Sequence, residues 1–174
     1  MNKELVDYGI RDERSHIRAH VSPQTKRVYV FRTSKILDLI ARNNYKSVPA
    51  YQPGFDFPTA TGYLVPVSDV PDIRVLAWQS YQWWLEFDER ASTTAKGRKA
   101  VWVVRELMRL GRFPLWFDGA EVEDKQIDIE GTDIIVAGRW RIQVKCDWKA
   151  GAKEHGGSGN LFIQIQECNP GDLH

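Results

Sequence analysis

The chain has 174 residues, of which 43% are hydrophobic and 27% are charged, and its formal net charge at pH 7 is +1. This length supports one compact domain, and the composition excludes a disordered, collagen-like or disulfide-framework protein. No apolar run approaches the roughly 20 residues of a membrane-spanning helix, and the first residues are charged, so we expect a soluble cytoplasmic protein.

In chain order, the first 25 residues are polar and charged, and they predict a frayed arm or a short helix. Residues 26–32 (KRVYVFR) are β-branched and aromatic between charges, which is typical of a strand. A helix over 35–45 is expected next, with Thr33 or Ser34 as its N-cap.

The middle of the chain predicts three further elements. Residues 49–58 are punctuated by proline and glycine and indicate a loop. Residues 62–67 (GYLVPV) predict a strand, and Pro66 favours an edge position for it. Residues 73–87 contain many apolar and tryptophan residues and predict a helix.

In the second half, a helix over 95–110 is expected, with N-caps among residues 92–94. From residue 113 onward the pattern predicts a meander of strands. A flexible Gly-rich loop over 149–159 and a last strand over 160–168 follow it.

Charge is distributed unevenly along the chain. Residues 90–112 hold seven cations against Glu106, and residues 113–135 hold seven acids against Lys125. A basic helix beside acidic strands is what a metal-dependent nuclease needs, with cations for the nucleic-acid backbone and carboxylates for the metal. The same segments are equally consistent with two solvated faces.

The segment 131–148 (GTDIIVAGRWRIQVKCDW) predicts two short strands joined by a tight turn at 137–139. Asp133 opens the first strand, and Gln143 and Lys145 share one face of the second, because side chains alternate across a strand. We therefore expect these side chains to converge on one point. A divalent cation beside a lysine at such a point suits phosphodiester hydrolysis.

This D-x9-Q-x-K pattern on a hairpin resembles the core of the PD-(D/E)XK nuclease superfamily, in which Gln sometimes replaces the acid before x-Lys. The resemblance covers residues 93–169. It implies an α/β (α+β) fold with a restriction-endonuclease-like or Holliday-junction-resolvase-like core, a mixed β-sheet flanked by helices. Residues 93–174 would form this core, and residues 1–92 an N-terminal extension or added layer within one compact domain.

The candidate catalytic residues are Asp133, Gln143 and Lys145. Carboxylate, amide and carbonyl oxygens suit Mg²⁺ or Mn²⁺, so the expected metal ligands are Asp133, Gln143 and the backbone carbonyl of Val144. Lys145 would stabilise the charge that develops on a phosphate. Cations on the basic helix and in the Gly-rich loop are expected to contact DNA: Arg98, Lys99, Lys149 and Lys153.

One part of the family's pattern is missing. The family usually has a glutamate on the helix before the sheet, four residues after a glycine, in a Gly-x-x-x-Glu pattern. In this chain Gly97 is the glycine, but the residue four positions later is Val101. Helical geometry places Glu106 roughly opposite the apolar stripe, which predicts a solvent-facing side chain. Either the site is weakened or a third acid comes from elsewhere, with Glu89, Glu121, Asp128 and Glu167 as candidates.

Two other features are interpreted as structural. His16 and His20 stand four residues apart but lack a second ligand pair, so no zinc site is expected. The tryptophans at 78, 83 and 84 are expected in the core or at an interface rather than as a base-stacking platform.

Three functions stay open. The first is a Mg²⁺- or Mn²⁺-dependent deoxyribonuclease, an endonuclease of restriction, repair or resolvase type. The second is a DNA-binding protein that keeps the nuclease fold with weakened or lost catalysis. The third is a protein-interaction module. Many nucleases of this kind pair two subunits, so a homodimer is a further expected partner beside DNA.

Overall fold

The computed structural model describes residues 15–51, 56–58, 60–78, 86–114, 122–123, 133–136 and 140–167. A six-stranded mixed sheet has the order β5 (Arg74–Ala77), β2 (Arg27–Arg32), β1 (Ile17–Ser22), β8 (Trp140–Cys146), β7 (Ile134–Val136) and β6 (Val122–Glu123). A three-stranded antiparallel sheet has the order β3 (Ser47–Ala50), β4 (Ala60–Pro66) and β9 (Asn160–Glu167). The helices are α2 (Thr33–Arg42) and α3 (Thr93–Arg109), with short 3-10 turns η1 (Val67–Asp69) and η4 (Lys153–His155).

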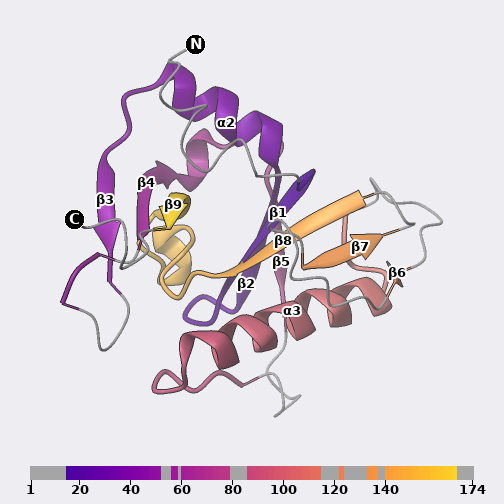
Figure 1. Cartoon of the computed structure of the whole chain (residues 1–174). Helices are drawn as coiled ribbons and strands as arrows, with labels where there is room; N and C mark the ends of the chain where they lie inside the picture. Colours follow the sequence, from indigo (N-terminus) through magenta and orange to yellow (C-terminus); the bar gives the residue numbers. More distant parts are fainter. Residues whose placement is uncertain are drawn as a thin grey trace.

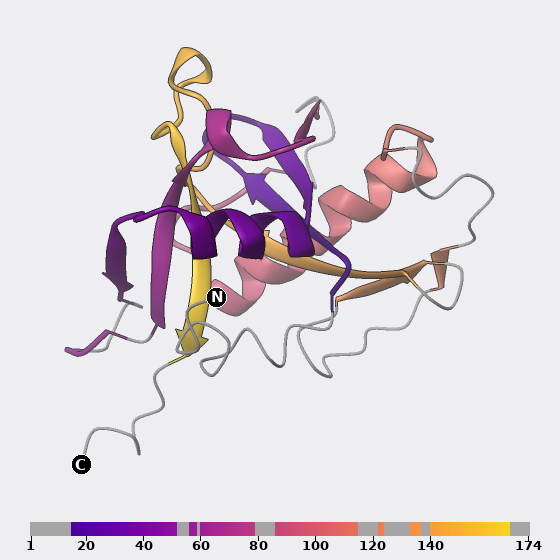
Figure 2. The same cartoon turned by 90° about the horizontal axis from the view of Figure 1, so that it is seen from above.

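The elements form layers around the larger sheet (Figure 1). Helix α3 runs beneath this sheet and packs on β8 and β1, whereas α2 lies above it. Seen from above, α2 crosses in front of β4 and β9 (Figure 2). The expected α+β class and the mixed sheet flanked by helices are therefore confirmed. Among the residues described, neither helix is both long and apolar enough to cross a bilayer.

Two hydrophobic cores lie on opposite faces of the larger sheet. The first contains the inward residues of α3, with Ala100, Val104 and Leu107 against Ile142 and its neighbours. The second contains Tyr29 and Phe31 from the other face of β2, packed with α2, β4 and β9. Alternation along β2 thus supplies apolar side chains to both layers.

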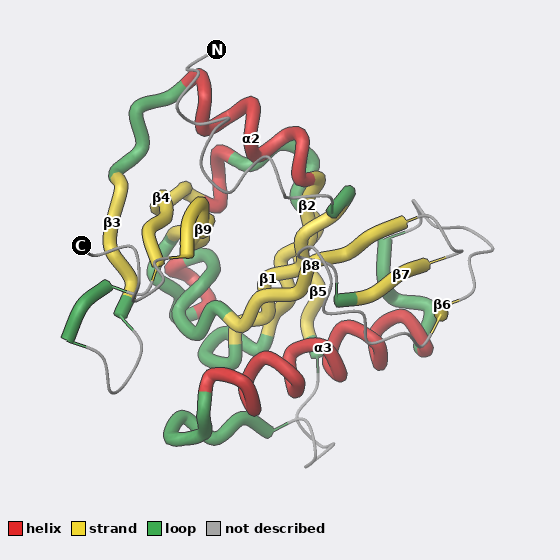
Figure 3. Tube along the Cα trace, viewed as in Figure 1, coloured by secondary structure: helices red, strands yellow, loops and turns green. Residues whose placement is uncertain are grey.

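Strand β1 lies inside the larger sheet, where we expected a frayed arm or a short helix. It pairs antiparallel with β2 and parallel with β8. The tube in Figure 3 shows the three strands close together. All six of its residues are buried. The prediction was wrong because Arg18 and His20 were taken as solvent-exposed, which hid the period-two alternation of Ile17, Ala19 and Val21.

Strand β5 is a second correction, because a helix was expected over 73–87. Arg74–Ala77 pairs antiparallel with β2, and Trp78 follows it into the first core. The side chain of Val75 is 45% exposed, because successive side chains of a strand point to opposite faces and that of Val75 points away from the first core. Pairing with β2 overrides the local pattern. Residues 79–85 lie outside the described part of the chain.

Helix α3 confirms the expected element and its ends. Ser92 Oγ accepts a hydrogen bond from the Ala95 N–H at 3.1 Å, and Gly111 follows the helix at φ +66°. Helix α2 is also confirmed, but it begins at Thr33 itself. Arg32 is its N-cap residue without a side-chain cap, so Thr33 or Ser34 as cap was wrong.

In the smaller sheet, β4 is the central strand, so the edge position inferred from Pro66 was wrong. Pro66 is the last residue of β4 and pairs with Asn160. Strand β3 pairs with β4 only over Ala60 to Tyr63, so at Pro66 the strand has a neighbour on the β9 side alone, which explains why a central strand can contain proline there. Strand β9 is confirmed, with Leu161 and Ile163 buried.

The Gly-rich loop over 149–159 is folded on itself by backbone hydrogen bonds. Gly159 N donates to Gly151 O at 2.7 Å, and Ser158 N donates to Lys149 O at 2.8 Å. Gly151 has φ +115°, and a Cβ there would lie 1.8 Å from the buried Tyr29 Oη. The loop expected to be flexible is therefore a defined turn that requires glycine at this position.

The variant Gly151→Ala should lower the free energy of unfolding by about 2 kcal/mol or more, because the new methyl group must displace Tyr29. Urea denaturation measures the loss. Gly156→Ala is the matched control, since its φ is +84° but nothing lies within 4 Å of a Cβ there. The control should lose only about 1 kcal/mol. Equal losses in the two variants would contradict this packing of Tyr29.

Candidate functional site

The β7–β8 hairpin brings the three predicted catalytic residues to one face of the larger sheet. Ile134 pairs with Ile142, so Asp133, one residue earlier, lies across from Gln143. The Asp133 N–H donates to Ile142 O at 2.9 Å and holds this arrangement. Lys145 follows on the same face, because side chains two apart along a strand point the same way.

The Asp133 carboxylate already has a structural partner. Its Oδ2 accepts a hydrogen bond from the Val144 N–H at 2.6 Å. Val144 lies beyond the last β7–β8 pair, so the carboxylate satisfies a strand N–H at the point where the ladder ends. The N–H and C=O of a strand residue point to the same edge, so the Val144 carbonyl faces the Asp133 side. A carboxylate has about four lone-pair positions, and this bond uses one of them.

Strand β1 adds two residues to this face that the sequence analysis missed. The parallel register places Arg18 beside Gln143 and His20 beside Lys145. Arg18 is 3% exposed, His20 0% and Gln143 9%. The sequence signal for them was the alternation within residues 17–22, a stretch that we expected to be a frayed arm or a short helix.

Asp147 is a third residue that was missed, and it continues the alternation of Gln143 and Lys145. Its Oδ2 lies 3.4 Å from His20 Nδ1 and accepts a hydrogen bond from Phe162 N at 2.9 Å. Asp147 therefore links β1 to β9 beside the hairpin. Extending the period-two pattern by one step beyond β8 would have identified it.

His20 is held neutral in the folded protein. Burial lowers its pKa, which the bond to Asp147 opposes and the charges of Arg18 and Lys145 reinforce. A carboxylate partner requires the proton on Nδ1, which leaves Nε2 as an acceptor. Within the described residues, Nε2 is buried and has no hydrogen-bond partner.

The charge balance of this face differs from that of a carboxylate-rich metal site. Arg18 and Lys145 accompany Asp133 and Asp147, and Asp147 is already bound to His20. Among the described residues, no group of three or more His, Cys, Asp or Glu could hold a metal ion. The expected ligand set is thus one carboxylate, one amide and one carbonyl.

The acids considered as a third ligand lie in different parts of the chain. Glu106 binds Arg109, with Arg109 Nε at 2.9 Å from Oε2, on the helix that covers the opposite face of the sheet. Its side chain is only 11% exposed, so the expected solvent-facing position was wrong. Glu89 is exposed in a turn, and Glu167 ends β9. Glu121 and Asp128 lie outside the described residues.

The four expected DNA-contacting cations do not share one surface. Arg98 and Lys99 belong to α3, on the face of the sheet opposite Gln143 and Lys145. Lys99 Nζ also donates to Glu86 O at 2.5 Å. By contrast, exposed Lys149 and Lys153 lie in the loop between β8 and β9. A substrate held by Arg98 is therefore on the other side of the sheet from Asp133.

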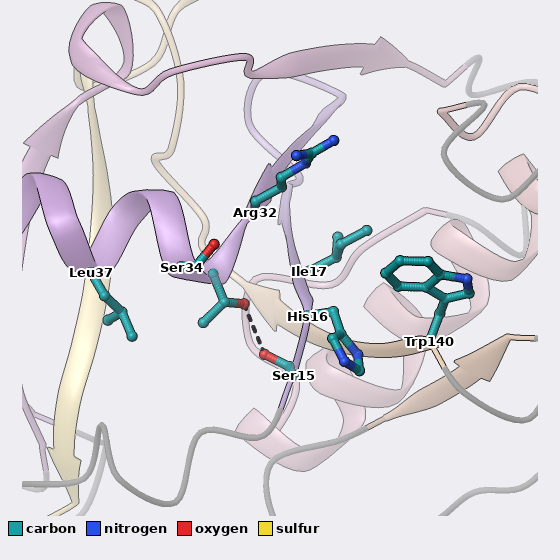
Figure 4. Close-up of a pocket in the computed structure, with 8 residues that line it drawn as sticks. Ser15, His16, Ile17, Arg32, Ser34, Leu37 and Trp140 are labelled. Carbon is teal, nitrogen blue, oxygen red and sulfur yellow. Dashed lines mark hydrogen bonds between the residues drawn. The ribbon is translucent and has the colours of Figure 1, made fainter.

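A cavity of about 390 Å³ lies near the N-terminal ends of β1 and β8 (Figure 4). His16 and Trp140 contribute rings in an edge contact at 5.3 Å, and Ser15 Oγ lies 3.0 Å from Thr33 Oγ1. His16 Nδ1 accepts the Arg141 N–H at 3.1 Å, so a neutral ring carries its proton on Nε2. The predicted site residues do not line this cavity.

Comparisons with protein-family models, with curated proteins and with solved structures give no match to this chain. Its function has to be inferred from the arrangement of its own side chains.

His20 makes stability depend on pH. Its folded pKa is lowered below the unfolded value of about 6.5, so protons bind preferentially to the unfolded chain as pH falls. The free energy of unfolding therefore keeps its full value above pH 6.5. Below pH 6.5 it decreases by at most about 1.4 kcal/mol per pH unit. Urea denaturation between pH 8 and pH 5 should show a shallower decline for His20→Asn than for the wild type.

His155→Asn, a change at an exposed histidine in η4, is the control and should keep the wild-type pH dependence. An unchanged decline in His20→Asn would show that His20 does not cause it.

Proposed function

We propose that this protein is a Mg²⁺- or Mn²⁺-dependent nuclease that hydrolyses phosphodiester bonds in DNA. The observation that carries the proposal is the meeting of Asp133, Gln143 and Lys145 on one face, where β7 and β8 separate. This is the arrangement that the resemblance to PD-(D/E)XK nucleases implies. The order α3, β6, β7, β8, with α3 packed on β8, supports a restriction-endonuclease-like core.

The donors present fit a hard divalent cation, since Asp133, Gln143 and the Val144 carbonyl all offer oxygen. When bound, such an ion polarises a phosphoryl oxygen and lowers the pKa of a coordinated water. With one formal charge among the three donors, the site is expected to bind it weakly. The Val144 N–H fixes the Asp133 carboxylate in place before any ligand arrives.

Lys145 is the residue proposed to act on the phosphate. Its side chain is half-buried and lies beside neutral His20, which does not compete with it for negative charge. A positively charged donor in a partly desolvated position stabilises charge that develops in a transition state more strongly than it would in water. Gln143, between Arg18 and Asp133, is positioned to orient the scissile group.

A second function is DNA binding through the same face without cleavage. Arg18 beside Gln143 is the observation that favours it, because a buried cation there opposes a second positive charge. The absence of a group of three metal-binding side chains among the described residues points the same way.

The test uses Asp133→Asn and Lys145→Met. An asparagine oxygen can still accept the Val144 N–H, so the first variant removes the charge but keeps the hairpin bond. Each variant should reduce cleavage of duplex, single-stranded or branched DNA by about 100-fold or more in Mg²⁺ or Mn²⁺. Gel-resolved product formation under single-turnover conditions measures the rate.

Lys46→Met, at an exposed position before β3, is the control and should cleave at the wild-type rate. Wild-type cleavage by both site variants would remove Asp133 and Lys145 from the mechanism. Salt-sensitive DNA binding by the wild type with no cleavage in either metal would establish the second function instead.

A further inference from the structure

The outer face of α3 carries a stripe of three arginines around one tryptophan. Arg98, Trp102, Arg105 and Arg109 are spaced by four, three and four residues, which places them on one side of an α-helix. The buried residues of α3 lie on the opposite side and face the sheet. At 1.5 Å per residue, the stripe is about 16 Å long.

Trp102 is the unusual member of this stripe. It is 51% exposed, whereas Trp78 in the first core is 7% exposed. A large aromatic side chain held in solvent between arginines contributes little to the fold's core. An exposed aromatic ring beside arginines is the combination that single-stranded nucleic acid sites use.

The charge of α3 favours an anionic partner. The helix has five cations (Lys96, Arg98, Lys99, Arg105 and Arg109) and one acid, Glu106, for a local charge of +4. Contacts within the fold hold several of these side chains: Lys96 lies 5.1 Å from the Trp148 ring, Lys99 bonds to Glu86 O and Arg109 bonds to Glu106. Arg98 is exposed next to Trp102, and Arg105 is half-buried one turn further on.

We propose that this stripe binds single-stranded nucleic acid, with the arginines on phosphates and a base stacked on Trp102. Every base has a π-face that an exposed aromatic ring can stack on, and arginines track the backbone. In a duplex those faces are covered by neighbouring bases, so a single strand fits the stripe better. The inference does not rest on the proposed nuclease function, because the stripe lies on the other side of the sheet from Asp133.

The experiment is fluorescence anisotropy of a labelled oligothymidine with the full chain in EDTA, which prevents cleavage. Trp102→Ala should weaken binding at least about fivefold, the lower end of the effect of removing a base-stacking ring. Trp102→Phe should retain part of the affinity. Arg98→Ala should reduce the slope of log affinity against log salt by about 0.7.

Leu110→Ala is the matched control, because Leu110 is 48% exposed at the end of α3 but lies off the stripe. This variant should bind as the wild type does. Circular dichroism checks that α3 is retained in each variant.

Wild-type affinity in Trp102→Ala, or no binding by the wild type, would overturn the inference. Equal affinity for a duplex, independent of Trp102, would also overturn it, since it would indicate charge attraction alone. Cleavage is measured separately with metal present, so a failure of stacking and a failure of catalysis are distinguishable.

Discussion

The parallel pairing of β1 with β8 brings Arg18, His20 and Gln143 into the interior of the molecule. Burial of polar groups costs free energy unless they are hydrogen-bonded, and within the described residues Arg18 Nε and Nη1 and His20 Nε2 have no such bond, so the bonds that these side chains do make matter more. Asp147 supplies one of these bonds: it binds His20 and also accepts the Phe162 N–H of β9. One carboxylate thus connects the larger sheet to the smaller one, beside the second core that packs the two sheets together.

The two faces of the larger sheet are chemically different. The face under α3 is apolar, and its side chains pack the helix whose own outer surface is basic. The other face is apolar only near β2, and across β1, β8 and the start of β7 it is polar. This division explains why Arg98, on the helix that precedes the hairpin strands in the chain, lies on the other side of the sheet from Asp133. The two proposed activities consequently lie on opposite sides of the larger sheet, one on its polar face and one on the outer surface of α3.

Local signals predicted part of this fold and part of its site. Caps and a 3.6-residue stripe identified α3, and the alternation around Gln143 identified the hairpin, because both are specified by near neighbours in sequence. Strand β1 could not be recognised, since Arg18 and His20 are buried only through a partner strand that is remote in sequence. Because β1 and β8 are so far apart in sequence, the local pattern could not include Arg18 and His20 in the predicted site. Asp147 differs, because continuing the local alternation past Lys145 reaches it.

Five of the six residues of β1, Ile17 to Val21, pair with residues 125 positions later in the chain. During synthesis, β1 and β2 emerge well before β8 exists, so one edge of β1 stays without its neighbour for most of translation. Such non-local pairing favours slow folding, although the entropy of closing so long a loop grows only with the logarithm of its length. An open strand edge can also pair with another chain. Pairing of β1 with a strand of another chain would bury Arg18 and His20 without their native partners, which costs free energy. These two residues would then disfavour aggregation of the nascent chain until β8 has been synthesised.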